Sequence, residues 1–363
     1  MSVATETQNQ NSSTKPPLQY LVIIRPLGLL YGSSGRFLSP ENLVGRSGVS
    51  FPPSAATVSG IFAHQLQNEP DKLNNLQLAG AFWALDNNQP ENFYVPTPLN
   101  CLVKEDKIQH TMSWKEGKWQ TFNQETKQWD IPPNDKYQSG TWINISNWKN
   151  INHKPEVKTP PWQFLPHLHP RLKNTDRTVD TESDRGSLFL ENAVQLNPDA
   201  CLIYLSNTEI PDGWYRFGGE GHMVEIECRS LGETAQTLLN KSLHHSFALI
   251  TPAIWGSNRL SYRAPQVDLK QNKLFWGDSE VAALLTGRPK PMRHRLGNKK
   301  EGHQAHQPKL LSRGRYAVPA GSVYVLDRSL NRTWHQWDES WFPHEGYSFK
   351  RWGCGLALPL DFG

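Results

Sequence analysis

Two adjacent prolines, Pro52 and Pro53, constrain this chain more than any other feature, because proline can neither continue a strand ladder nor lie inside a helix. Ser54 follows them at the N-cap position of a helix. The apolar residues that come next recur at helical spacing and predict one buried face: Val58, Ile61, Phe62 and Leu66. We therefore expect a docked helix over 54–67, with its free N–H groups pointing toward the glycine-rich loop 28–36. Such a corner can hold a phosphate without any catalytic side chain.

The order of the predicted elements indicates an α+β fold class. A strand over 19–26, the helix over 54–67 and a hairpin of 76–85 with 92–99 form the first part of a ferredoxin-like βαββαβ unit. Later segments predict further elements: strands at 187–190, 193–196, 201–206 and 223–228, a helix at 234–243, a strand at 246–254, a short helix at 279–285, and strands at 315–326 and 355–360. We expect tandem ferredoxin-like (RRM-like) domains, a tandem inferred from element order alone.

The expected domain limits follow from composition. Residues 1–17 are polar and lack an apolar centre, so they predict a disordered tail and not a signal peptide. We expect an N-terminal domain over 18–232, with an insertion at about 102–185, and a C-terminal domain over 240–363. No apolar run is long enough for a membrane-spanning helix. Four scattered cysteines without a Cys-x-x-Cys pair favour buried thiols in a reducing cytoplasm: Cys101, Cys201, Cys228 and Cys354.

The insertion is rich in tryptophan, with Trp114, Trp119, Trp129, Trp142 and Trp148 set among polar residues. The segment 114–119 predicts a tight turn at Glu116-Gly117 with tryptophans packed across two strands. Aromatic residues interleaved with lysines also suit a base-stacking platform for single-stranded nucleic acid. Cross-strand packing explains the same residues more simply and is the favoured interpretation.

Positive charge is concentrated in one segment. Residues 287–315 hold nine Lys and Arg and one acid, a local charge of +8, whereas the whole chain carries +4, so the remainder carries −4. The segment predicts a basic loop that either contacts a polyanion such as RNA or is simply solvated.

Three glycine-rich turns next to predicted strands are candidate phosphate sites, because glycine lets backbone N–H groups approach phosphate closely. They are 28–35, 218–221 and 353–355, and each has arginine or lysine nearby, whereas an isolated glycine turn is more often structural. The candidate RNA-binding residues at the turns, the helix corner and the basic loop are Tyr31, Gly32, Ser33, Ser34, Gly35, Arg36, Arg46, Ser54, Thr57, Gly218, Gly219, Gly221, His222, Arg293, Arg295, Lys299, Lys300, Lys350, Arg351, Gly353 and Gly355.

The sequence supports no catalytic or metal site. The first turn lacks the Lys-Ser/Thr pair of a nucleotide-binding loop, and Glu220 stands alone where a two-metal site needs a second carboxylate. His167 and His169 lack further ligands at a useful spacing, so they are interpreted as part of a proline-bounded loop. We therefore expect no cofactor, no metal and no catalytic residue.

Several of these motifs together resemble the RAMP superfamily of type III CRISPR effector subunits, and most closely the family of the third subunit of the Cmr (type III-B) complex. The motifs lie in family order at 21–66, 78–82, 93–100, 186–189, 217–222 and 317–324. The Trp-rich insertion and the basic loop have no clear counterpart among them.

The resemblance implies a non-catalytic, cytoplasmic CRISPR RNA-binding subunit that serves antiviral defence. It implies that the chain holds the 5′ tag of the guide RNA, partly through the glycine-rich loop beside its last strand. The implied protein partners are the large palm-domain signature subunit and a neighbouring backbone RAMP subunit, with no membrane. Tag bases could stack on Tyr31, Phe37 or Trp352.

Two alternatives remain. The first is a metal-independent endoribonuclease that processes precursor CRISPR RNA, with His64 or Tyr31 as base and Arg36 or Arg351 as its electrostatic partner. The second is a scaffold for protein docking in which RNA contact is incidental.

Overall fold

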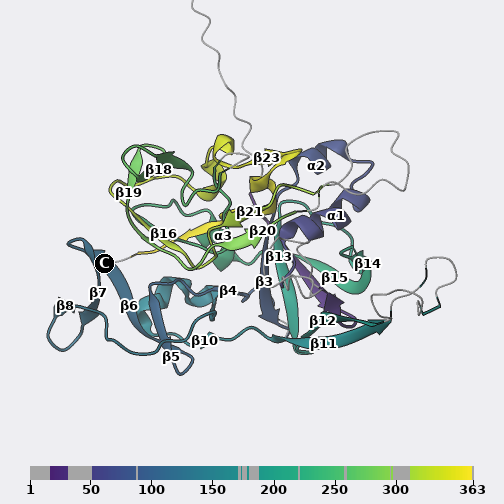
Figure 1. The fold of residues 1–363 in the computed structure, drawn as a ribbon, viewed down its shortest axis with the longest axis horizontal. Helices are drawn as coiled ribbons and strands as arrows, with labels where there is room; N and C mark the ends of the chain where they lie inside the picture. Colours follow the sequence, from purple (N-terminus) through teal and green to yellow (C-terminus); the bar gives the residue numbers. More distant parts are fainter. Residues whose placement is uncertain are drawn as a thin grey trace, which may run out of the picture.

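The computed structural model describes residues 17–31, 51–86, 89–170, 173, 178–179, 188–219, 221–256, 260–294, 296 and 311–361. Within them the protein is mostly β, built from antiparallel sheets with few helices (Figure 1). The α-helices are α1 (Ala55–Gln65), α2 (Pro70–Asn75) and α3 (Glu233–Leu239). None of these helices has the length and apolar character needed to cross a membrane. The α+β expectation is thus correct only in part, and residues 1–16 of the expected tail lie outside the described residues.

The larger sheet has eight strands in the order β10-β9-β4-β3-β13-β1-β15-β14. Its strands are β1 (Tyr20–Pro26), β3 (Leu78–Leu85), β4 (Tyr94–Pro96), β9 (Trp142–Asn144), β10 (Val157–Lys158), β13 (Ala200–Ser206), β14 (Gly213–Phe217) and β15 (His222–Ser230). The four central strands run antiparallel as β3-β13-β1-β15, with α1 in the connection from β1 to β3. This is the strand order of a ferredoxin-like unit.

The third strand of that unit is β13 and not the expected hairpin strand 92–99. All seven residues of β13 are buried, which suits a strand between β3 and β1. The shorter β4 pairs with β3 only through Trp83 and Tyr94 and lies on the outer side of it. Prolines at 96 and 98 have no N–H for a ladder, so this segment is suited to a less central place.

The second sheet has six strands in the order β17-β18-β19-β22-β16-β25. Its bounds are β16 (Ser246–Leu249), β17 (Gln266–Asp268), β18 (Lys273–Trp276), β19 (Ser279–Leu285), β22 (Val323–Leu326) and β25 (Ala357–Pro359). The strands β19-β22-β16-β25 repeat the second-third-first-fourth order of the larger sheet.

The expected helix at 279–285 is wrong, because these residues form β19. Its sequence SEVAALL is rich in good helix formers, but pairing with β18 on one side and β22 on the other overrides this weak preference. In place of helices, the described chain between β22 and β25 carries 3-10 turns: η3 (Trp334–Gln336), η4 (Glu339–Trp341) and η5 (Phe349–Trp352).

Part of the insertion forms a separate four-stranded sheet, β5-β6-β7-β8. Its strands are β5 (Cys101–Lys104), β6 (Lys107–Lys115), β7 (Lys118–Asn123) and β8 (Gln128–Asp130), and a 3-10 helix, η2 (Ile145–His153), follows β9. Trp114 and Trp119 face each other across the strands with ring centroids 5.6 Å apart, and Glu116 and Gly117 form the turn with positive φ. The predicted cross-strand tryptophan pair is confirmed.

A long hairpin extends from the body at the end opposite this inserted sheet (Figure 1). It consists of β11 (Trp162–Pro170) and β12 (Leu188–Leu196), with β2 (Leu30–Tyr31) added beside β12. His167 and His169 therefore lie in a strand and not in the expected loop. Two small ladders complete the fold: β20 (Lys290–Met292) with β21 (Arg315–Ala317), and β23 (His344–Glu345) with β24 (Tyr347–Ser348).

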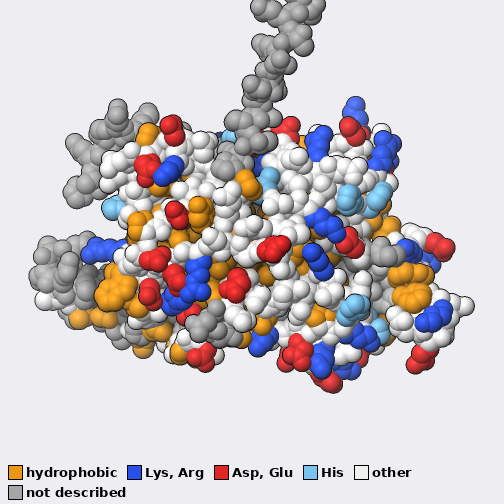
Figure 2. Space-filling model, turned by 180° about the vertical axis from the view of Figure 1, so that it is seen from behind, with side chains coloured by type: hydrophobic (Ala, Val, Ile, Leu, Met, Phe, Trp, Pro, Cys, Tyr) orange, Lys and Arg blue, Asp and Glu red, His pale blue; other side chains and the backbone are white. Residues whose placement is uncertain are grey.

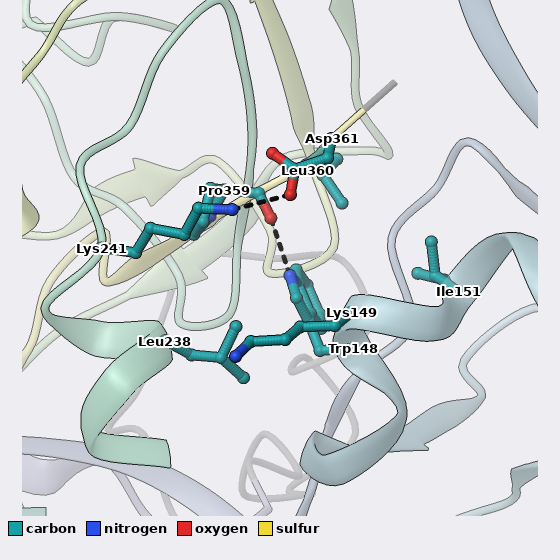
Figure 3. A pocket seen from close by; sticks show the side chains of 8 residues that line it. All are labelled: Trp148, Lys149, Ile151, Leu238, Lys241, Pro359, Leu360 and Asp361. Atoms are coloured by element: carbon teal, nitrogen blue, oxygen red, sulfur yellow. Dashed lines mark hydrogen bonds and ion pairs between the residues drawn. The ribbon is translucent and has the colours of Figure 1, made fainter. Parts of the chain in front are cut away.

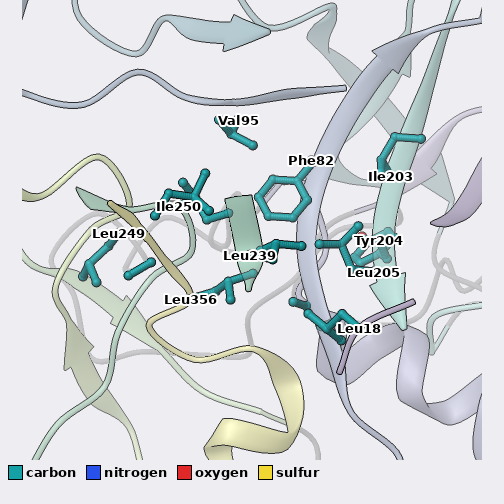
Figure 4. Packing of buried hydrophobic residues seen from close by; sticks show 14 of the residues in the cluster. Leu18, Phe82, Val95, Ile203, Tyr204, Leu205, Leu239, Leu249, Ile250 and Leu356 are labelled. Carbon is teal, nitrogen blue, oxygen red and sulfur yellow. The ribbon is translucent and has the colours of Figure 1, made fainter. Parts of the chain in front are cut away.

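One hydrophobic core joins the two large sheets (Figure 4). Phe82 of β3 points toward Leu239 of α3, and Ile250 and Leu356 approach from the C-terminal sheet. Polar contacts cross the same junction, for example from the Trp148 indole N–H to the Pro359 carbonyl at 2.8 Å. The two sheets are therefore packed as one body.

Gly353 offers a test of this junction, since a Cβ there would lie 2.5 Å from the Ala79 Cα of β3. Gly346 has a similar positive φ, 81° against 69°, but a Cβ there would meet nothing within 4 Å. Both alanine variants carry the penalty of the left-handed backbone. We expect Gly353→Ala to lower the free energy of unfolding, measured with urea, by about 2 kcal/mol more than Gly346→Ala. Equal losses of unfolding free energy in the two variants would show that the β3–η5 contact accommodates the added methyl group without an extra energetic cost.

Candidate nucleic-acid interface

The corner before α1 is fixed to the larger sheet. Ser54 adopts an extended N-cap conformation, and its carbonyl accepts the N–H of Thr57 at 2.9 Å, although its side chain makes no capping bond. The hydroxyl of Tyr204 in β13 donates to the Pro53 carbonyl at 2.6 Å. Burial raises the pKa of that Tyr204 hydroxyl, which therefore stays protonated as a donor. The corner is thus positioned by the sheet as well as by the two prolines.

The described residues on either side of 32–50 contact the same hairpin. Tyr31 pairs with Ala193 of β12, and the Phe51 ring packs edge-on against Trp162 of β11 at 5.1 Å. Gly28 is exposed, and a Cβ there would meet nothing within 4 Å. The predicted binding residues Gly32, Ser33, Ser34, Gly35, Arg36 and Arg46, and also Phe37, lie outside the described residues, and only the backbone of Tyr31 is described.

The second glycine turn lies beside the start of that loop. Gly218 and Gly221 have positive φ and connect β14 to β15, and the Gly218 and Gly219 positions are exposed. The Leu27 N–H donates to the Met223 carbonyl at 3.1 Å, so the exit of β1 runs along the beginning of β15. His222 is half-buried and pairs with Phe217 across the two strands. Arg216, in the next residue pair with Met223, is exposed. The structure thus brings the residues that lead into the first predicted turn next to the second.

The third predicted turn, 353–355, is inside the protein. A Cβ at Gly353 would collide with Ala79, and one at Gly355 would lie 2.8 Å from the Trp255 ring. Glycine is needed here for tight packing and not for access to a ligand. The expectation that Gly353 and Gly355 hold RNA phosphates is therefore corrected.

The two cations next to this turn are also structural. Lys350 is 3% exposed and donates to the carbonyls of His335 and Trp337, at 2.9 and 2.5 Å. Arg351 is 5% exposed; its guanidinium donates to the carbonyls of Leu73 and Asn74 at the end of α2 and lies over the Tyr347 ring. Burial lowers the pKa of Arg351. Neither side chain is available to RNA.

Trp352 next to them is 8% exposed and packs against Phe349, with ring centroids 5.6 Å apart. No base could stack on this ring without displacing the core, so the stacking role expected for Trp352 is corrected too.

The basic segment leaves the body from a rigid stem. The Ser312 N–H donates to the His294 carbonyl, and the His294 N–H donates to the Ser312 Oγ, both at 2.8 Å. The Arg293 Nε donates to the Ser312 carbonyl at 2.7 Å. Arg315, counted in the basic segment, is buried in a salt bridge with Glu345. Arg295, Lys299 and Lys300 lie outside the described residues, so the structure describes only the stem of the expected loop.

Other candidate sites are weaker. In the described part of the chain, no three or more His, Cys, Asp or Glu residues gather as a metal site would require. A shallow pocket between η2, α3 and the C-terminal strand is closed by a Lys241–Asp361 ion pair of 2.7 Å and by the Trp148–Pro359 hydrogen bond (Figure 3). These contacts make the pocket a packing junction.

One structural feature at the surface was not expected from the sequence. Arg25 forms a two-pronged salt bridge with Asp86 and also contacts Glu227, and Arg229 pairs with the same glutamate. Arg25 lowers the pKa of Asp86, which holds the pair in its charged form. The pairing of β1 with β15 brings Glu227 to Arg25, and the position of β13 between β3 and β1 brings Asp86 close as well. No local sequence signal indicates these long-range pairings.

Together, these observations define a mostly β protein with two antiparallel sheets of repeated strand order, an exposed glycine turn next to the exit of β1, and a helix corner at Ser54. The model of the CRISPR-associated protein family Cas_Cmr3 matches residues 40–361. The chain belongs to this family, which confirms the resemblance to the third subunit of the type III-B Cmr complex. The protein is therefore a type III-B CRISPR effector subunit.

Comparison with solved structures finds distant matches. A chain in the cryo-EM structure of type III-B Cmr-beta bound to cognate target RNA is 13% identical, with 84% of this chain and 86% of that chain covered and a TM-score of 0.45. A chain of the Csm1–Csm4 cassette in complex with pppApA is 11% identical, with coverages of 86% and 88% and a TM-score of 0.34. A chain of the Csm3–Csm4 subcomplex of type III-A is 12% identical, with coverages of 85% and 93% and a TM-score of 0.33. No curated protein matches by sequence.

The buried histidines predict an acid-sensitive fold. Burial lowers the pKa of His294 and of His335 from 6.5 to about 4; Arg315 lowers and Glu345 raises that of His294, and Lys350 lowers that of His335. The unfolded chain binds a proton at each histidine below pH 6.5, whereas the native protein does not until about pH 4. Stability is therefore full above pH 6.5 and is lost as the pH falls toward 4.

Between pH 7 and pH 5 we expect the free energy of unfolding to fall by about 2 kcal/mol for each buried histidine. The ring of His294 packs between Phe349 and Trp352, so His294→Phe should remove about half of this pH dependence. His64→Phe, at an exposed position, is the control for the change of side chain itself. Urea unfolding at several pH values measures all three proteins, and a pH dependence unchanged in His294→Phe would refute the assignment.

The buried position of Arg351 predicts that replacing it lowers stability without weakening RNA binding. Arg351→Met leaves the carbonyls of Leu73 and Asn74 without this donor, so the free energy of unfolding should fall by about 1–3 kcal/mol while the folded variant binds RNA normally. Arg216→Met, at an exposed position, should change stability by less than about 0.5 kcal/mol. A stable Arg351→Met variant with impaired RNA binding would contradict the structural role.

Proposed function

We propose that this protein is a non-catalytic RNA-binding subunit that holds the 5′ tag of the guide RNA in its type III-B effector complex. It docks the large palm-domain signature subunit and contacts a neighbouring backbone RAMP subunit. The complex acts in the cytoplasm, in antiviral defence. Binding of the tag is positional: the RNA is gripped and is not chemically changed.

The observation that carries the proposal is that three features are tied to neighbouring parts of the fold. Tyr31 and Phe51 both contact the β11–β12 hairpin, the Ser54 corner follows Phe51 and opens α1, and the exit of β1 bonds to Met223 just after the Gly218–Gly221 turn. Gly28 and Gly218 have open space where a side chain would be. Backbone N–H groups can approach phosphate oxygens closely at such positions.

Side chains would add to this backbone cradle. Arg216 is exposed one residue pair away from the turn and can supply a charged, two-pronged donor to a phosphate. The residues at 32–36, Arg46, Arg295, Lys299 and Lys300 remain part of the proposal on the strength of the sequence. Phosphate contacts of this kind fix the register of a strand, and stacking of bases on Tyr31 or Phe37 would add selectivity.

The proposed protein partners have a structural counterpart in the β11–β12 hairpin. Phe164 and Leu168 lie on one side of β11 and are 43% and 60% exposed. Exposed apolar residues of this kind on a narrow sheet are typical of a contact surface, so a neighbouring subunit would cover them. The free thiols of Cys101, Cys201 and Cys354 are buried, and burial raises the pKa of Cys201 to about 12, which suits a reducing compartment.

The endoribonuclease alternative needs Arg36 or Arg351 as the electrostatic partner of the base, and one of the two is unsuitable. Arg351 is buried against α2 and cannot stabilise a transition state at the surface. His64 lies in the last turn of α1, whereas the proposed phosphate cradle lies at its first turn. Cleavage of a repeat RNA by the purified protein without metal, abolished in His64→Ala, would support the nuclease and count against our proposal.

The test uses the chain assembled with its large subunit and a photoreactive guide RNA. We expect crosslinks at residues 28–36, near Ser54 and at 216–222, and we expect them to vanish when the tag is deleted. Arg216→Glu should weaken binding of the tagged guide about threefold to tenfold because one phosphate contact is lost. Arg328→Glu is the matched control, since that arginine is 74% exposed and lies after β22 on the other sheet. Crosslinks that map elsewhere would refute the proposed site.

A further inference from the structure

The inserted sheet β5–β8 has two unequal faces, because directly paired residues on antiparallel strands share a face. One face carries the pairs Met112–Thr121 and Trp114–Trp119. Met112 and Thr121 are buried, and Trp119 packs against the main core. This face attaches the insertion to the body.

The other face, which we call the outer face, carries the pairs Ser113–Gln120, Lys115–Lys118 and Phe122–Trp129. Phe122 is 38% exposed, and its ring meets Trp129 edge-on with centroids 5.4 Å apart. Lys115 extends along the strands so that its Nζ lies 5.2 Å from the centre of the Trp129 ring. Aromatic and ammonium groups are thus gathered in one cluster.

The charges of the two faces differ as well. Where β6 pairs with β7 and β7 pairs with β8, the charged residues are Lys115, Lys118 and Asp130. Both lysines lie on the outer face, and Asp130, paired with Thr121, lies on the attached face. At these positions the charge of the outer face is therefore positive, which suits a surface that contacts phosphates.

We propose that the outer face is a stacking platform for unpaired nucleotides of an RNA strand. Phe122 and Trp129 would receive bases, whose flat faces stack on aromatic rings without regard to sequence, and Lys115 and Lys118 would neutralise the adjoining phosphates. Gln120 lies between them as a hydrogen-bonding amide. A protein partner is less favoured because the paired positions of this face hold one aromatic pair and two lysines, with no acid among them.

The platform is remote from the proposed tag site. In Figure 1 the strands β6–β8 lie at one end of the molecule, and β11, β12, β14 and β15 lie at the other. Figure 2 shows hydrophobic side chains with charged neighbours at the surface of the end where the inserted sheet lies. The inference rests on the proposed function in that the protein works on RNA, but it concerns a second contact separate from the tag.

The test measures binding of a fluorescent oligouridine and a fluorescent oligoadenosine to the full chain. Phe122→Ala combined with Trp129→Ala should weaken binding of both about tenfold, because stacking is tolerant of sequence. Lys115→Gln combined with Lys118→Gln should lower the slope of log affinity against log salt by about 1.4, the value for two lost phosphate contacts on a single strand. Ile131→Ala is the matched control: Ile131 directly follows β8, is 80% exposed and cannot stack, so binding should not change.

A second measurement distinguishes RNA binding at the outer face from RNA binding at the tag site. Oligouridine containing 4-thiouridine should crosslink to the peptide with Trp129, while tag-dependent crosslinks at residues 28–36 stay the same in the platform variants. If the double aromatic variant fails to fold, Phe122→Ser alone and the lysine variants give the same comparison.

Unchanged affinity and unchanged salt slope in folded platform variants would overturn the platform and leave the tag proposal standing. Loss of co-purification with another effector subunit, with RNA binding intact, would identify the outer face as a protein-docking surface and would also overturn it. Loss of tag crosslinks in the wild-type protein, with oligouridine binding retained, would instead count against the proposed function.

Discussion

The contact between η5 and the edge of β3 and α2 is the constraint on which the rest of the structure depends. Gly353 brings the backbone of the C-terminal sheet against Ala79, and Arg351 binds the last carbonyls of α2. The carbonyl oxygens and the Tyr347 ring replace the water that the charged guanidinium loses on burial. The two sheets are thereby held as one body, and the surface features at either end keep a fixed separation.

The same contact explains why one of the predicted phosphate-binding turns serves packing instead. Glycine next to lysine and arginine is a fair signature of phosphate binding, and it occurs three times in the chain. At Gly218 the turn closes an exposed hairpin, whereas at Gly353 it lets two sheets approach each other. Local sequence contains no information about which turn a distant strand will cover. The two turns differ in whether they are buried, and this difference can be read only from the three-dimensional structure.

The parts of the fold that could be predicted are those set by local chemistry. Pro52 and Pro53 fixed the start of α1, and Glu116-Gly117 fixed the turn that pairs Trp114 with Trp119. The strand β13 was predicted from its unbroken apolar run. Its place as the third strand was missed, because the hairpin of 76–85 with 92–99 is nearer in sequence. The segment 279–285 was predicted as a helix because its composition favours one, yet two neighbouring strands impose β structure on it.

The pairing of β3 with β13 has a consequence for how the chain is made. The whole Trp-rich insertion is synthesised after β3 and before its partner. Until β13 has left the ribosome, the segment Leu78–Leu85 presents the apolar sequence LAGAFWAL as an open strand edge. Such edges associate readily with other nascent chains. The larger sheet can therefore be completed during translation only after the whole insertion has been synthesised.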